Sequence, residues 1–310
     1  KQKNEKACTT QLFIEGDAFQ VKIKHGLRVM VHRLQVSEGV ILNGKRHILK
    51  QRYIISGLNR RLVFEQMSEY LDSHYDCKNT QIITGSDNGS GYEPSAFQVF
   101  SPTKEQHVHV LDAYHLNRKL KERFSLMPTP LKKRLRQAVF AADKPQVKMI
   151  LDTAESIATN GDYRDDVADN IKRLRDYLNR NWDSIKPFAV VQWRHSGLGS
   201  CESNHRAYTY RLKKQGRSWS ITGLKAMLMI IDAEQNGELE RSLRQTTMFN
   251  APQRLTDNGQ IVIAPNFKLR SLFAVGKHND HVGAKSGVIN AQGVTGTSFG
   301  RFARALNDLN

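Results

Sequence analysis

The sequence of 310 residues contains few cysteines, and none of them forms a close pair. Metal-binding and redox motifs that use cysteine place two of them within a few residues of each other, so neither class is expected. A disulfide framework is not indicated either, and we expect a reducing environment. His107 and His109 alternate along a short apolar run, and without a cysteine pair they do not indicate a structural zinc site. The cysteines are Cys8, Cys77 and Cys201.

Long apolar runs are also missing. The most apolar stretch, around Leu224 to Ile231, is too short to span a bilayer, so we expect no membrane insertion. The first residues, Lys1 to Lys6, are charged and lack the apolar core of a signal peptide. Because no Met precedes them, we expect a further N-terminal segment. No glycine-rich loop ends in Lys-Ser or Lys-Thr, so ATP hydrolysis is not indicated.

Positive charge is what the sequence has in excess. Lys and Arg number 47 against 30 Asp and Glu, which gives a formal net charge of +17 and a pI near 9.8. A soluble protein needs a far smaller net charge, so the expected partner is a polyanion whose binding is steeply salt-dependent. Charged runs on helices often only face solvent, but the net charge favours contact with phosphates. The basic residues concentrate in Lys119–Arg123, Lys132–Arg136, Arg206, Arg211, Lys213, Lys214 and Arg217.

The first third of the chain has the pattern of a mixed α/β sheet. Short β-branched or alternating runs predict successive antiparallel strands, with Asn43-Gly44 as a hairpin turn. Helical spacing follows at Leu62–Tyr75, and then come two more short apolar runs. Successive strands followed by a helix, a strand, a second helix and a last strand are typical of a mixed sheet rather than of a pure βαβ repeat. The predicted strands are residues 11–15, 19–23, 28–34, 51–55, 81–84 and 107–111.

The rest of the chain changes character twice. A charged, helix-rich segment runs to about Pro187, strand-like patterning resumes weakly at residues 188–192, and a helix is predicted from Glu202 through Arg211. After about Asn236 the pattern loosens, and residues 276–300 are predicted to be an extended or partly disordered arm. We therefore expect an α/β domain in two parts, with an all-helical insertion between them and a partly irregular extension after them. The boundaries are 1–116, 117–187, 188–236 and 237–310.

Three acidic residues are placed where they could act together on a phosphate. Asp17 and Asp87 each follow an apolar run, so both can stand at strand ends of one sheet, and Glu202 lies at a predicted helix start. Magnesium prefers a few carboxylate oxygens together with water and substrate phosphate. Taken singly, each acid is more often a turn, a cap or a residue that stabilises the helix dipole.

Four segments carry a more specific signal, and together they resemble the bacterial insertion-sequence transposases of the ISLre-two group. That family is similar in turn to the Mutator-like DDE transposases. The most diagnostic segment starts with Glu202-Ser-Asn and ends with Lys-Lys-Gln-Gly-Arg-Ser-Trp-Ser220. The four segments are Phe13–Ala18, Ile82–Asp87, Val110–Leu116 and Glu202–Ser220.

The resemblance implies an RNase H-like fold in which Asp17, Asp87 and Glu202 form the acidic triad. It also implies two Mg²⁺ ions, for which Mn²⁺ can substitute, and an all-helical insertion before the glutamate. DNA would be the partner, as transposon ends and as target, and the protein would be a homo-oligomer when assembled on DNA, cytoplasmic and nucleoid-associated. The loop Gly85–Tyr92 departs from the family pattern, Gly-Asp-Gly-Ala followed by Trp, so substrate contacts there are expected to differ.

Several further residues are candidates for contact with DNA. Asp112 and His115 match an Asp-x-x-His element of the Mutator-like enzymes and could touch a metal or a phosphate, but a strand-end Asp paired with a helix-cap His is an equal alternative. Trp193, beside Arg194, could stack on an unpaired base or lie in the core. Arg206 lies one turn beyond Glu202 and could reach the same phosphate. Trp219 could stack on DNA or anchor a helix.

The function that the sequence predicts is metal-dependent DNA cleavage at transposon ends, followed by strand transfer into target DNA. Both steps are phosphoryl transfers and need no covalent protein intermediate. Two alternatives stay open. One is a non-catalytic, domesticated DNA-binding protein, and the other is an RNase H-like nuclease without joining activity.

Overall fold

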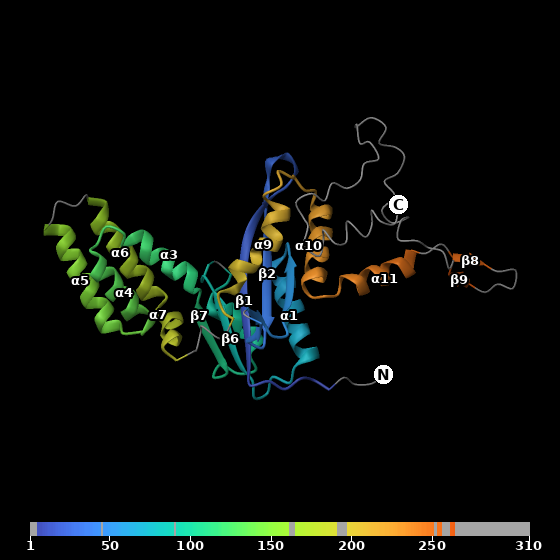
Figure 1. The fold of residues 1–310 in the computed structure, drawn as a ribbon, viewed down its shortest axis with the longest axis horizontal. Coiled ribbons are helices and arrows are strands. Elements are labelled where there is room, and N and C mark those ends of the chain that lie inside the picture. Colours follow the sequence, from blue (N-terminus) through green and yellow to red (C-terminus); the bar gives the residue numbers. More distant parts are fainter. Residues whose placement is uncertain are drawn as a thin grey trace. The chain divides into compact units, whose positions relative to one another are not determined.

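A computed structural model describes residues 5–44, 46–89, 91–160, 165–190, 197–250, 253–255 and 261–263. The chain divides into two compact units, residues 1–239 and 240–310. The first unit is built around one five-stranded sheet (Figure 1). The second is described by a helix, α11 (Leu239–Asn250), and an antiparallel pair of short strands, β8 (Gln253–Leu255) and β9 (Ile261–Ile263). The predicted arm at residues 276–300 lies outside the described residues.

The sheet is mixed, as the sequence predicts, with the strand order β5-β2-β1-β6-β7. Antiparallel pairing joins β1 to β2 and β2 to β5, whereas β6 is parallel to both β1 and β7. The central strand β1 therefore has an antiparallel neighbour on one side and a parallel one on the other. The strands are β1 (Gln11–Lys22), β2 (Arg28–Ser37), β5 (Tyr53–Gly57), β6 (Gln81–Ser86) and β7 (His107–Leu111).

The prediction of two separate strands at residues 11–15 and 19–23 is wrong, because β1 is continuous. Gly16, Asp17 and Ala18 stay in register with residues of β2 across the whole stretch. Gly16 marks a close approach and not a turn. A Cβ at this position would come within 2.7 Å of the Phe97 ring and 2.8 Å of the Leu34 side chain.

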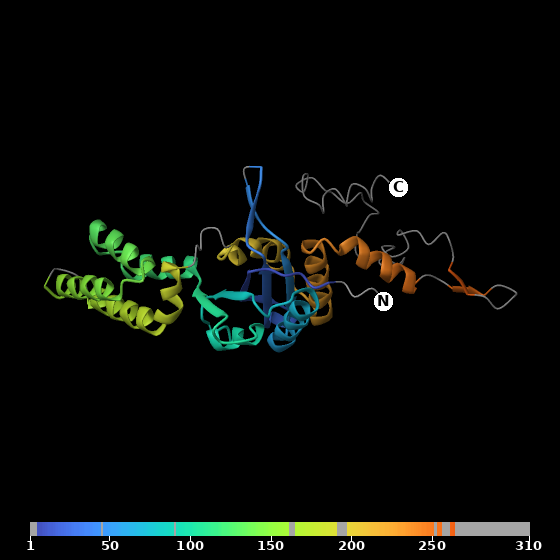
Figure 2. The same ribbon diagram turned by 90° about the horizontal axis from the view of Figure 1, so that it is seen from below.

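A separate two-stranded sheet, here called the ribbon, lies between β2 and β5 in the chain. It consists of β3 (Val40–Asn43) and β4 (Arg46–Leu49). The predicted turn at Asn43-Gly44 is confirmed, since it joins these two strands. The ribbon, drawn in blue, projects away from the five-stranded sheet (Figure 2).

Helices cover both faces of the sheet because the side chains of β1 alternate between two apolar layers. Leu12 and Ile14 pack with α1 (Arg60–His74), α2 (Pro94–Phe97) and a 3-10 turn, η2 (Gln98–Phe100). Phe19 and Val21, which point to the opposite face, pack with α9 (Ser200–Leu212) and α10 (Ile221–Gln235). The helices predicted at residues 62–75 and 202–211 are thereby confirmed as α1 and α9.

Helices fill the segment between β7 and α9 in which the sequence predicts a helical block. Their apolar core continues onto the sheet through Phe13, Ile83, Val110 and Leu111. The strand-like reading of residues 188–190 is wrong, because Phe188 belongs to a 3-10 turn and is buried in this core. The helices are α3 (Ala113–Arg123), α4 (Thr129–Phe140), α5 (Lys144–Asn160), α6 (Asp165–Arg180) and α7 (Trp182–Ile185), followed by η3 (Lys186–Ala189). Within the described part of the chain, no helix has the length and apolar character that crossing a membrane requires.

We expect Leu34→Ala to destabilise the sheet strongly. Leu34 is 0% exposed and packs under α1, so its truncation leaves a cavity and lowers the free energy of unfolding by about 2–5 kcal/mol. Leu62→Ala is the control, because Leu62 is 53% exposed on α1 and its loss costs less than about 0.5 kcal/mol. Urea denaturation measures both values. Equal losses in the two variants would contradict the packing described here.

Candidate active site

The carboxylates of Asp17, Asp87 and Asp112 come together along one edge of the sheet, here called the carboxylate edge. The register pairs Glu15 with Gly85 across β1 and β6, so Asp17 and Asp87 each lie two residues beyond paired positions. Asp112 directly follows β7, and its N–H donates to the Ser86 carbonyl at 2.6 Å. All three residues line one small, open hollow.

Asp17 lies in the middle of β1, which corrects the expectation that it ends a strand. It nevertheless stands at the edge, because its parallel neighbour β6, and β7 beyond β6, stop earlier. Its side chain is 25% exposed, and Oδ2 lies 2.9 Å from Nε2 of His205 on α9. Oδ1 accepts the Ala18 N–H at 2.6 Å. The carboxylate is therefore held in place from two sides.

Asp87 is exposed and follows β6 directly, as expected. Its Oδ1 accepts the Gly89 N–H at 2.8 Å, which closes a small turn. The adjacent Asn88 fixes this loop, since its amide donates to Asn181 Oδ1 at 2.9 Å and to Ser184 Oγ at 3.1 Å. Asn181 directly precedes α7, Ser184 lies in α7, and both are buried. The helical block therefore positions the loop that carries Asp87.

Asp112 and His115 form the helix cap that the sequence allows as an alternative to a DNA contact. Asp112 Oδ1 accepts the His115 N–H at 2.8 Å and lies 3.2 Å from His115 Nδ1. Burial alone would raise the pKa of Asp112, but the hydrogen bonds from His115 outweigh it and the pKa is lowered. The hydrogen bond to Asp112 raises the pKa of His115 in turn. Since both residues also line the hollow, capping α3 and facing a substrate are compatible.

The first turn of α9 lies at the same edge. Cys201 lines the hollow together with Asp17 and Asp87, and His205 contacts Asp17. Glu202 follows Cys201 in this turn, but its side chain lies outside the described residues. The structure thus places the backbone of residue 202 between two residues that reach the carboxylate edge.

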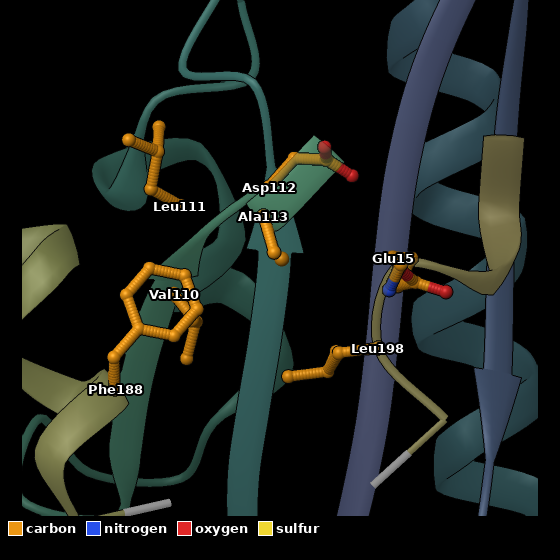
Figure 3. Close-up of a pocket in the computed structure, with 9 residues that line it drawn as sticks. Glu15, Val110, Leu111, Asp112, Ala113, Phe188 and Leu198 are labelled. Atoms are coloured by element: carbon orange, nitrogen blue, oxygen red, sulfur yellow. The ribbon is translucent and has the colours of Figure 1, made fainter. Parts of the chain in front are cut away.

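Glu15 is a component of the site that the sequence analysis missed. It is buried on β1 and accepts hydrogen bonds from the Gly199 N–H, from Ser200 Oγ at 2.9 Å and from the Cys201 N–H at 3.1 Å. The N–H groups at a helix start lack partners within the helix, so Glu15 acts as the cap of α9. Burial raises the pKa of Glu15 to about 7, against the effect of the Gly199 and Ser200 hydrogen bonds. Figure 3 shows Glu15 on β1 lining a pocket with Asp112, which follows β7.

Two polar residues of β2 complete the docking of α9. Gln35 donates to Ser200 Oγ at 2.8 Å and accepts from Asn204 at 2.9 Å. Arg33 is fully buried and donates to the Cys201 carbonyl at 3.0 Å. We call this set of sheet residues, Glu15, Arg33 and Gln35, the α9 anchor. A signal for it exists in the sequence, because polar residues at alternate positions of two apolar strands indicate a polar patch on one face.

The candidate DNA contacts after Glu202 have varied surroundings. Arg206 is exposed, and the residue that reaches Asp17 is its neighbour His205. Arg211 pairs with Glu234 at 2.6 Å, whereas Lys213 lies over the Phe19 ring at 4.9 Å. Lys214 and Arg217 are exposed in the turn after α9.

The three sequence candidates that contain or adjoin tryptophan fare differently. Trp219 donates to the Leu212 carbonyl at 3.2 Å and packs with the α9 and α10 core, which is the anchoring role. Trp193 and Arg194 lie outside the described residues.

His107 and His109 contact Thr84 at 2.8 Å and 2.7 Å, in a buried polar network.

The residues of the carboxylate edge fit a magnesium ion. Among the described side chains, no group of three or more His, Cys, Asp or Glu could by itself hold a metal. Magnesium does not require one, because it usually takes one or two protein carboxylates and completes its shell with water and substrate phosphate. Asp17 and Asp87 supply oxygen donors of this kind beside an open hollow.

Comparison with known proteins gives a family for most of the chain. The model of a family described as "Uncharacterised protein family (UPF0236)" matches residues 1–248. A protein of Streptococcus gallolyticus described as "UPF0236 protein in vanSb 3'region" is 33% identical over 301 residues. The alignment covers 94% of this chain and 62% of that relative, so the chain spans less than two thirds of the relative's length.

The raised pKa of Glu15 predicts a pH dependence of stability. A folded-state pKa of about 7, above the ordinary 4.5, means that the folded protein favours the neutral carboxyl. The contribution of Glu15 to the free energy of unfolding is therefore complete below pH 4.5 and falls by about 3 kcal/mol as the pH rises to 7 and above. Chemical denaturation across this range, with wild type and Glu15→Gln, measures it.

In Glu15→Gln this part of the pH dependence should be absent. Glu65→Gln, an exposed change on α1, should keep the wild-type curve. A Glu15→Gln curve that falls as steeply as that of wild type would show that another group causes the dependence.

Proposed function

We propose that this chain, which belongs to the UPF0236 family, is the catalytic part of a DNA transposase. It cleaves DNA at the ends of a mobile element and joins the ends to target DNA by metal-dependent phosphoryl transfer. The observation that carries the proposal is the convergence of Asp17, Asp87 and the first turn of α9 at one edge of the sheet.

The sheet supports an RNase H-like fold for this domain. Three strands pair antiparallel and two more continue in parallel, with helices on both faces and a helical block before α9. Asp17 is on the central strand, and Asp87 follows the strand parallel to it. Their position at the same edge of the sheet supports their assignment as the first two acids of the triad.

In the proposed mechanism, Asp17, Asp87 and Glu202 would hold Mg²⁺, which would supply activation of the attacking oxygen and neutralisation of the charge on the phosphate. His205 orients the Asp17 carboxylate through its 2.9 Å contact, and Asn88 holds the loop of Asp87 against α7. His115 contacts Asp112 through Nδ1 and can donate to a phosphate oxygen through its other ring nitrogen.

The basic residues after the triad glutamate supply the contact to DNA. Arg206, Lys214 and Arg217 are exposed on or just after α9, which begins at the carboxylate edge. Neutralising phosphates releases counterions, so binding by a chain of net charge +17 weakens steeply as salt rises. Each lost phosphate contact should reduce the salt dependence without changing sequence preference.

We expect Asp17→Asn and Glu202→Gln to abolish cleavage and strand transfer while duplex DNA binding is retained. Loss of a metal-holding carboxylate should lower the rate by more than about 100-fold, since even outer partners of metal ligands contribute 10–100-fold. The assay uses labelled DNA that carries the element's ends, with Mg²⁺, Mn²⁺ or chelator. Asp72→Asn, an exposed change on α1, is the matched control and should keep full activity.

Each alternative function has its own outcome in this assay. DNA binding without any metal-dependent cleavage by wild type would identify a non-catalytic binding protein. Cleavage without joining, even from a pre-cleaved end, would identify a nuclease. Cleavage that persists in Asp17→Asn would refute the assigned triad.

A further inference from the structure

The ribbon exposes three large apolar side chains. Ile41 is 44% exposed and faces Ile48, which is 40% exposed, across the two strands. Leu42 is 68% exposed and faces His47. Two strands alone are marginally stable in water, and apolar residues clustered on a projection commonly mark a contact surface. The ribbon therefore has the character of an element that meets a partner.

The charge around the ribbon indicates what kind of partner this is. Between Glu38 and Glu65 the chain contains no acidic residue, although it contains 30 Asp and Glu in all. The turn of the ribbon has the sequence Asn43-Gly-Lys-Arg46, and further basic residues follow. A second copy of this chain would bring the same positive charge, with a net charge of +17, whereas a polyanion would neutralise it. The basic residues of the ribbon and of the segment that follows it are Lys45, Arg46, Lys50 and Arg52.

The base of the ribbon is fixed next to the start of α9. Across the base of the ribbon, the Glu38 N–H donates a hydrogen bond to the Lys50 carbonyl. The Lys50 ammonium also pairs with the Glu38 carboxylate at 2.8 Å. Val40 and Leu49 are half-buried against Gly197, where any Cβ would collide with Leu49. Because Gly197 precedes α9 by only a few residues, the ribbon emerges beside the loop that leads into α9 and projects away from the sheet (Figure 2).

We propose that the ribbon enters a groove of the duplex DNA that the carboxylate edge and α9 bind. A two-stranded ribbon fits the major groove, where apolar side chains can contact thymine methyl groups. The basic turn would contact the phosphates and set the position of the duplex, while Ile41, Leu42 and Ile48 contact base edges and sugars. This inference rests on the proposed function, because it takes the DNA at the site as given.

The test uses equilibrium binding of a labelled mixed-sequence duplex to the full chain in chelator, at several salt concentrations. Ile41→Thr with Leu42→Thr keeps β-branched or β-compatible side chains on the ribbon but removes apolar surface. We expect binding about 10-fold weaker, from the loss of buried apolar contact. Met149→Gln is the control, since Met149 is 54% exposed on α5.

A second pair of variants tests the charge. Lys45→Ala with Arg46→Ala should reduce the slope of log K against log salt by about 2, which corresponds to two phosphate contacts. The control with the same change in net charge is Lys78→Ala with Lys104→Ala. These exposed residues precede β6 and β7, at the end of the sheet opposite to the carboxylate edge. Their slope should equal that of wild type.

The outcomes separate this inference from the proposed function. If wild type cleaves DNA but the ribbon variants bind the duplex as wild type does, the ribbon inference alone is overturned. If the ribbon variants lose binding as expected while wild type never cleaves, the transposase proposal fails and the ribbon inference stands. Unchanged DNA binding with an altered oligomeric state by light scattering would instead assign the ribbon to contact between copies of the chain.

Discussion

The arrangement of the site depends on one buried contact, in which Glu15 on β1 accepts hydrogen bonds from the start of α9. The N–H groups at a helix start have no acceptor within the helix and need one from elsewhere. Gly199 precedes the helix and has no side chain to act as a cap, so the acceptor comes from a residue 184 positions earlier in the chain. The contact joins the two parts of the α/β domain that the helical block separates.

A second constraint acts from the other side of the carboxylate edge. Asn88 links the loop of Asp87 to Asn181 and to Ser184 of α7, so the helical block contributes to the position of a candidate metal ligand. The interruption of the domain therefore has a structural consequence at the site itself. Together with the α9 anchor, it brings segments that are far apart in the sequence to the same edge of the sheet, where His205 holds Asp17.

Local signals in the sequence predicted α1, α9, β6 and β7, because hydrophobic period and turn residues act over a few positions. They failed at β1, where Gly16-Asp17-Ala18 has the composition of a turn. The glycine is needed there because the Phe97 ring leaves no room for a side chain. The register that aligns Asp17 with Asp87 could not be predicted, since strand pairing is decided by the whole sheet. Glu15 and His205 were missed for a related reason: their partners are distant in sequence, and only the fold shows what they contact.

The proposed role of the carboxylate edge is to hold divalent metal for chemistry on DNA. A crystal structure of the chain with a cleaved DNA end and Mn²⁺, in which anomalous scattering locates the ions, tests this role. We expect Mn²⁺ bound by Asp17 and Asp87, with the Glu202 carboxylate as a further ligand and the DNA phosphate in contact with the ion. Ions bound only elsewhere on the chain, with the DNA end away from Asp17, would contradict it.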